Sequence, residues 1–293
     1  MNVKHILNEI EKVDPEVYER LDTRRNAMKQ FAGAAGKIAA VAVPFALGSM
    51  FKKAYGRNTG TDTVIDVLNF ALTLEYLEAK FYQLGNAAAT AGTLAIPAGV
   101  ERSTFQTIGA HETAHVAFLR SAITSSGGTP VAEPVFDFTA GNGTGTGPFM
   151  GVFTNYALYL AVAQTFEDTG VRAYKGQATD VELMANNDVL TAALQIHSVE
   201  ARHAAQVRRI RKALGGAFVP AGVDVKPWIT LNQSGIASAA VQASYDGEQI
   251  TNQATIEIVN INGKAISANA ASEAFDEPLT MAQVLAIVDP FIV

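Results

Sequence analysis

The chain has 293 residues, of which 48% are hydrophobic and 17% are charged, and its formal net charge is −6. This apolar content excludes an intrinsically disordered chain, and the length allows one large domain or two modest ones. The absence of cysteine excludes a disulfide scaffold, a thiolate metal site and a cysteine nucleophile. Any bound metal must therefore be held by histidine, carboxylate or backbone oxygen.

The net charge is unevenly distributed. Residues 1–58 carry 10 Lys/Arg and 6 Asp/Glu, a net charge of +4, whereas the other residues carry 12 and 22, a net charge of −10. Because an acidic body is repelled by phosphate, no nucleic-acid partner is expected. The basic segment needs a separate explanation.

The basic segment is typical of an export signal. Arg24-Arg25 precedes a stretch of 14 uncharged residues between Lys37 and Lys52. This stretch is shorter than the roughly 20 residues of a membrane-spanning helix but has the length of a signal-peptide apolar region. Residues 1–58 resemble a twin-arginine leader, which implies an extracytoplasmic, periplasmic or exported protein cleaved near Gly56. Membrane contact is then expected only through an uncleaved leader. The alternative is an ordinary amphipathic helix with a chance arginine pair.

Four helical segments are expected in residues 59–214. The first runs from about 61, where Asp62 can cap it, to Gly85, and the others span about 101–123, 149–175 and 188–214. The Gly- and Pro-rich stretch 125–148 is too long for a tight turn and suits a crossover between the ends of a bundle. Gly215-Gly216 is expected to end the fourth helix. The predicted fold is an all-α four-helix bundle with a long crossover between its second and third helices.

Residues 215–293 are expected to form an irregular C-terminal extension packed on the bundle. Asn262-Gly263 is a hairpin-like pair, and the Thr280–Gln283 sequence has the form of a capping box before a short helix that Pro290 stops.

The chemistry is carried by two Glu-x-x-His sequences, Glu112–His115 and Glu200–His203, on the second and fourth predicted helices. Residues three apart on a helix share a face, so each pair can aim a carboxylate and an imidazole at one point. Glu75 and Glu167 offer one further carboxylate each, on the first and third helices. Tyr82 and Tyr174 follow these two glutamates by seven residues. The two halves therefore repeat each other and indicate a pseudo-two-fold site.

A charge count favours two metal ions at this site. Four buried glutamates without cations would suffer strong mutual repulsion and desolvation, whereas two divalent ions would neutralise them. Oxygen-rich ligation with one imidazole per metal favours iron or manganese, although zinc or copper could compete on raw affinity.

This combination of ligands resembles the ferritin-like superfamily of dinuclear carboxylate proteins, over roughly residues 61–214. The resemblance implies that Glu75 and Glu167 each bind one metal, that Glu112 and Glu200 bridge the two, and that His115 and His203 each bind one. More narrowly, the chain is similar to exported ferritin-like proteins related to desiccation-associated proteins, and the segment 273–280 extends that likeness.

The implied function is redox chemistry of a dinuclear iron or manganese centre towards oxygen or peroxide, of a ferroxidase-, catalase- or oxidase-like kind. The alternative is a non-catalytic metal-binding stress or envelope protein. The oligomeric state is open, and a homo-oligomer is one option. A different class of function is raised by His111-Glu112-Thr113-Ala114-His115, an H-E-x-x-H sequence typical of zinc proteases. That interpretation leaves the other carboxylates without a role.

Four further features have simpler interpretations. Glu78, one turn beyond Glu75, could be an alternative ligand or an acid beside the metals, but it is expected to face solvent. Tyr82 and Tyr174 could be radical or hydrogen-bond partners near the metals, but they are expected to be core residues with satisfied hydroxyls. His111 and His197 are expected beside the site or on the surface. The basic cluster 208–212 is expected to be a solvated last turn of the fourth helix.

Overall fold

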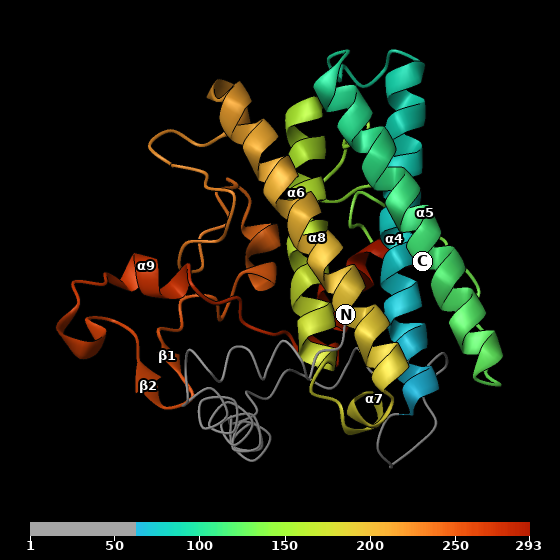
Figure 1. The fold of residues 1–293 in the computed structure, drawn as a ribbon. Helices are drawn as coiled ribbons and strands as arrows, with labels where there is room; N and C mark the ends of the chain where they lie inside the picture. The colour runs from blue at the N-terminus through green and yellow to red at the C-terminus, as the bar shows by residue number, and fades with distance from the viewer. Residues whose placement is uncertain (1–62) are drawn as a thin grey trace, which may run out of the picture. The chain divides into compact units, whose positions relative to one another are not determined.

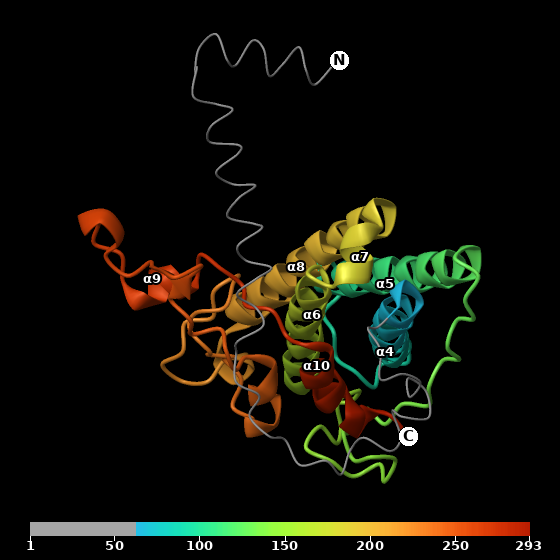
Figure 2. The same cartoon turned by 90° about the horizontal axis from the view of Figure 1, so that it is seen from below.

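The structure is a computed structural model that describes residues 63–293. Four long helices dominate: α4 Val64–Thr90, α5 Val100–Ser125, α6 Tyr156–Gln177 and α8 Asn187–Leu214. α4 packs mainly against α5, α6 packs against α8, and α4 and α6 adjoin across the centre (Figure 1). A short helix, α7 Val181–Ala185, precedes α8 and contacts α4 and α8 at one end of the bundle (Figure 2). The predicted all-α bundle is confirmed. The predicted leader, residues 1–58, lies outside the described residues.

The helix boundaries differ from expectation at three points. α4 begins after Thr63, which forms a capping box with Asp66. It continues past Gly85, which was expected to end it. Gly85 has another role, because a β-carbon there would lie 2.4 Å from the Tyr159 ring of α6. α6 begins at Tyr156 rather than at 149, because turns fill the preceding residues and Asn155 supplies the N-cap.

The crossover between α5 and α6 lies against the C-terminal end of the chain. The Asp137 amide donates to the Phe291 carbonyl at 2.8 Å, and the Val293 amide donates to the Val135 carbonyl at 2.9 Å. Phe136 and Ile292 form an antiparallel bridge between them. The crossover is thereby held by residues about 150 positions further along the sequence.

The C-terminal extension consists of short elements. The 3-10 helices are η2 Gly216–Phe218, η3 Ala239–Ser244, η4 Ile261–Gly263 and η5 Asp289–Phe291, and the α-helices are α9 Ala268–Ser272 and α10 Met281–Val288. α10 starts at the predicted capping box of Thr280 and packs against α6 (Figure 2). The Leu279 amide donates to the Arg172 carbonyl of α6. None of the helices in residues 63–293 is long and apolar enough to cross a membrane.

A small hairpin spans Asn252–Glu257. β1 Asn252–Gln253 pairs antiparallel with β2 Ile256–Glu257, and Ala254 and Thr255 make the turn with positive φ. The pair Asn262-Gly263 has positive φ at both residues and forms a tight turn, closed by a bond from the Lys264 amide to the Ile261 carbonyl, as expected of a hairpin-like pair; the turn lies within η4 rather than between β1 and β2.

Candidate metal centre

α5 and α8 present their Glu-x-x-His sequences to the bundle interior because each lies on the buried stripe of its helix. The buried residues of α5 recur at helical spacing: Phe105, Ile108, Glu112, Leu119 and Ile123. On α8, Glu200 and His203 lie between the buried Ile196 and Val207. Glu112 is fully buried within an otherwise apolar stripe. The burial of a charged side chain at such a position demands a compensating partner.

Glu75 on α4 and Glu167 on α6 are also fully buried. Both helices are central, and apolar residues flank each glutamate, with Leu74 and Tyr76 beside Glu75 and Phe166 beside Glu167. Each glutamate therefore points into the interior without solvent contact.

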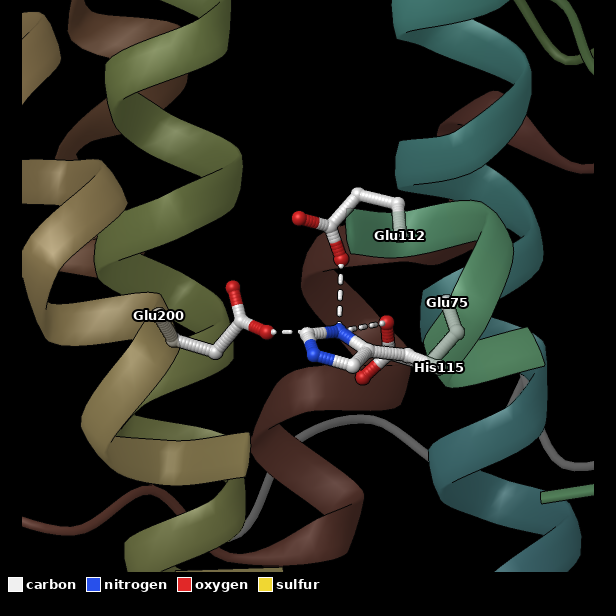
Figure 3. A group of neighbouring side chains, drawn as sticks. All are labelled: Glu75, Glu112, His115 and Glu200. Carbon is white, nitrogen blue, oxygen red and sulfur yellow. Dashed lines mark hydrogen bonds and ion pairs between the residues drawn. The ribbon is translucent and has the colours of Figure 1, made fainter. Parts of the chain in front are cut away.

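One half of the candidate site gathers around His115 (Figure 3). Its Nδ1 lies 3.0 Å from Glu112 Oε2, 3.2 Å from Glu75 Oε2 and 3.3 Å from Glu200 Oε1. The four side chains come from α4, α5 and α8. Their ligand atoms all lie within 4.8 Å of one another, a spacing that can hold a metal ion.

The other half gathers around His203. Its Nδ1 lies 2.9 Å from Glu112 Oε1, 3.2 Å from Glu167 Oε2 and 3.6 Å from Glu200 Oε2. Glu112 and Glu200 thus face both histidines, each with its two oxygens divided between the halves. Glu75 faces only His115, and Glu167 faces only His203. The structure brings all six predicted residues together in the predicted arrangement, whereas their role as ligands is a proposal.

Several of these atoms lie at ion-pair distance without hydrogen-bond geometry. Among the described residues, Glu112 Oε1, Glu167 Oε2, both carboxylate oxygens of Glu200 and His203 Nδ1 are buried and have no hydrogen-bond partner. Buried polar atoms without such partners are rare, and an ion is one of the groups that satisfies them. The donor set and its orientation therefore fit metal binding.

The electrostatics of the cluster are those of carboxylates kept from water. Burial raises the pKa of Glu75 and Glu167 well above the ordinary range. Burial opposes ionisation of Glu112 as well, but the hydrogen bond with His115 and the close approach of His203 outweigh it and lower the pKa of Glu112 to about 2. Although burial lowers the pKa of His115, the nearby carboxylates of Glu112, Glu200 and Glu75 raise it to about 12. Without cations, protons partly neutralise the cluster.

Two tyrosines donate hydrogen bonds to the outer carboxylates, those of Glu75 and Glu167, which each face a single histidine. The Tyr174 hydroxyl of α6 donates to Glu75 Oε1 on α4, and the Tyr82 hydroxyl of α4 donates to Glu167 Oε1 on α6. In each case the other oxygen, Oε2, is the one that faces a histidine. The tyrosines are core residues with satisfied hydroxyls, as expected, and they also orient the carboxylates of the centre.

Glu78 is not exposed, contrary to the prediction. It is 3% exposed, and burial followed by the nearby charge of Glu200 raises its pKa well above the usual range. Its position three residues after Glu75 places it on the same inward face of α4, and this spacing was the signal that could have located it. Its carboxylate lies against Gly170 beside Glu200.

His111 lies beside the centre. Its Nδ1 is 2.9 Å from Nε2 of His203, so the two rings share a proton and stack at 5.2 Å between centroids. His111 belongs to neither group of potential ligands, which does not favour the H-E-x-x-H arrangement. His197 lies further away, half-buried, with its Nδ1 3.0 Å from the Val171 carbonyl oxygen.

The basic cluster at the end of α8 is only partly solvated, which corrects the prediction. Arg209 and Lys212 are exposed, but Arg208 and Arg211 are each 2% exposed. Arg208 forms a bidentate ion pair with Asp168 of α6, and Arg211 donates to Gln164 and to the Gly235 carbonyl of the extension. The alternation follows the helical period, which places every third residue on the α6 side.

The comparison with protein families agrees with the fold and the site. A family model described as a ferritin-like domain matches residues 63–213, more than half of the chain. The chain belongs to this ferritin-like family. No curated protein and no solved structure matched it in the corresponding comparisons. The ferritin-like domain and the buried Glu/His cluster are together compatible with metal binding.

Proposed function

We propose that this ferritin-like protein binds two iron or manganese ions between its four long helices and uses them in redox chemistry with oxygen or peroxide. One observation carries the proposal: Glu112 and Glu200 each divide their two oxygens between His115 and His203. Carboxylates placed in this way can span two cations, whereas a single-ion site would need only one of the histidines.

The six side chains would divide into two sets. One ion would be held by Glu75 and His115, and the other would be held by Glu167 and His203. Both ions would be bound by Glu112 and Glu200. Four carboxylates and two divalent ions are neutral together, which removes the repulsion among buried charges. Oxygen ligands with one imidazole each favour iron or manganese. When bound, the ions supply the electrons and the Lewis acidity.

The chain's own contribution is orientation and exclusion of water. Tyr174 and Tyr82 occupy the outer oxygens of Glu75 and Glu167 and so direct the inner oxygens towards the centre. When His111 Nδ1 accepts from Nε2–H of His203, it fixes the tautomer that leaves Nδ1 of His203 free for an ion. The surrounding helices leave all four glutamates fully buried, so bulk water does not reach their carboxylates.

Metal analysis of natively produced protein, with anomalous scattering at the iron and manganese edges, tests the binding. About two ions per chain are expected beside the two histidines. Glu112→Ala combined with Glu200→Ala should abolish binding of both, as should the isosteric Glu→Gln pair, which guards against a packing defect. The matched control replaces two exposed glutamates, Glu133 and Glu182, by alanine and should retain both ions. Full occupancy in the Glu112/Glu200 variants would refute the assignment.

Redox activity is tested separately by consumption of oxygen or peroxide with the loaded protein. Turnover supports an oxidoreductase. Two bound ions without turnover would favour the metal-binding stress or envelope role instead.

A further inference from the structure

An apolar cavity of about 40 Å³ lies between α4, α5, α6, α7 and α8. Fifteen residues line it, and only Tyr174 and Gln177 among them carry a polar side-chain group. The others include Ala71 of α4, Leu119 of α5, Leu183 of α7 and Ile196 of α8. The cavity is therefore enclosed almost entirely by hydrocarbon.

The cavity lies one helical turn from the candidate metal centre, on the side of α7. Ala71 precedes Glu75 by four residues, Leu119 follows His115 by four, and Ile196 precedes Glu200 by four. Because neighbouring helices run in opposite directions, these offsets all point towards the same end, a displacement of about 6 Å along the axis. The ring of Tyr174 lines the cavity while its hydroxyl donates to Glu75. Cavity and centre thus share a wall.

The size and lining of the cavity restrict what it can hold. It exceeds the roughly 10–15 Å³ needed for one water and is smaller than a cavity of about 150 Å³ that accepts benzene. A water molecule also needs two to four polar partners; the hydroxyl of Tyr174 already donates to Glu75, which leaves Gln177 as the other polar side chain of the lining. The cavity suits a small apolar molecule.

Dioxygen and hydrogen peroxide, the two oxidants proposed for the centre, differ in polarity. Dioxygen is apolar and loses no hydrogen bonds on entering hydrocarbon. Hydrogen peroxide carries two O–H donors, and burying each polar group without a partner costs about 2–7 kcal/mol. The lining therefore discriminates in favour of dioxygen.

The cavity reaches the surface between α5 and α8. Phe118 is 44% exposed, and Val189 and Ala193 are half-buried, although all three line the cavity. A molecule entering here meets apolar side chains from the surface to Tyr174.

We propose that this cavity binds dioxygen and delivers it past Tyr174 to the metal centre, so that dioxygen rather than hydrogen peroxide is the oxidant. The delivery part of the proposal rests on the proposed function, whereas the binding of a small apolar molecule does not.

Xenon, an apolar probe of similar size, tests the binding without any metal. In crystals of the metal-free protein under xenon pressure, an anomalous peak is expected among Ala71, Leu119 and Ile196. Ala71→Leu, which fills the interior, should remove it, and Ala117→Leu, on the exposed face of α5, should not. No xenon at this position in the unsubstituted protein would overturn the proposal.

Stopped-flow oxidation of the reduced iron form tests delivery. Ala71→Leu, or Ala193→Phe at the mouth if overpacking disturbs the first variant, should slow the reaction with dioxygen roughly tenfold. The reaction with peroxide should be unchanged, and Ala117→Leu should match the unsubstituted protein. An unchanged dioxygen rate, or equal slowing with both oxidants, would overturn delivery. A metal-loaded protein inert to both oxidants that still binds xenon would instead refute the redox function, and delivery with it.

Discussion

The helix pairs α4–α5 and α6–α8 present corresponding side chains to the candidate centre, but the two pairs are buried to different extents by the rest of the protein. Among the corresponding helices, α6 buries 17 of 22 residues and α4 buries 16 of 27, while α8 buries eight of 28 and α5 buries five of 26. The C-terminal extension contributes to this difference, because η2, η3 and α10 pack against α6. His203 on α8 is 6% exposed at its side chain, and His115 on α5 is 13% exposed.

The charged residues show the same inequality. Arg172, Arg208 and Arg211 are buried where α6 and α8 meet the extension, and Arg172 pairs with Glu248 at 2.7 Å. The ion pair that joins α4 to the crossover, Lys80 with Glu133 at 2.9 Å, is largely exposed. The repeated candidate ligands therefore do not require a repeated scaffold. The α6–α8 pair buries three arginines against the extension, whereas α4 is held to the crossover by hydrogen bonds of Asn69 and Tyr76 and α5 leaves most of its residues unburied.

The largest expected effect separates the two halves of the centre itself. Glu75→Ala should leave about one ion per chain, beside His203, and Glu167→Ala should leave about one, beside His115, because each glutamate faces a single histidine. Elemental analysis gives the count, and anomalous difference maps give the position. If either variant lost both ions or kept both, the two halves would not be separable in this way.

A smaller but substantial effect is expected on stability. Asp168→Ala leaves Arg208 buried without its carboxylate and should lower the free energy of unfolding by about 3–5 kcal/mol. Glu133→Ala removes the exposed partner of Lys80 and should cost no more than about 1 kcal/mol. Urea denaturation of the metal-free variants measures both. Similar losses would show that the two helix pairs are equally anchored.

The smallest effect concerns the support of one histidine. His111→Ala removes the partner of His203 Nε2 and should weaken binding of the adjacent ion by about 10–100-fold. Val199 holds the matching position before Glu200, and Val199→Ala should change affinity by no more than about twofold. Competition titrations with a chelator of known affinity compare them. Equal effects would remove the asymmetry between the halves.

The bundle and the convergence of its six candidate ligands could be predicted from the sequence because both follow from helical periodicity. Glu112 and His115 are three residues apart within an apolar stripe, and that spacing alone sets their direction. The same rule applied to Glu78 would have placed it inside, but a charged side chain near Lys80 also suits a solvent-facing position.

Other features depended on contacts that no local pattern encodes. Gly85 continues α4 because Tyr159, more than 70 residues later, packs against it. Arg208 and Arg211 are buried because Asp168, Gln164 and the extension supply their partners. A run of basic residues at a helix end is compatible with either solvent or such partners, and only the tertiary structure decides between them.

The crossed tyrosine bonds have a thermodynamic consequence. Glu75 on α4 is held by Tyr174 of α6, and Glu167 on α6 is held by Tyr82 of α4, so each outer carboxylate is oriented by the opposite helix pair. An ion that orders one half therefore orders part of the other, in addition to the bridging carboxylates. If the proposed ions bind, such coupling would be reciprocal, so each ion would raise the affinity for its neighbour by the same factor. At limiting metal, the population should divide into empty and doubly loaded chains, with few that carry a single ion.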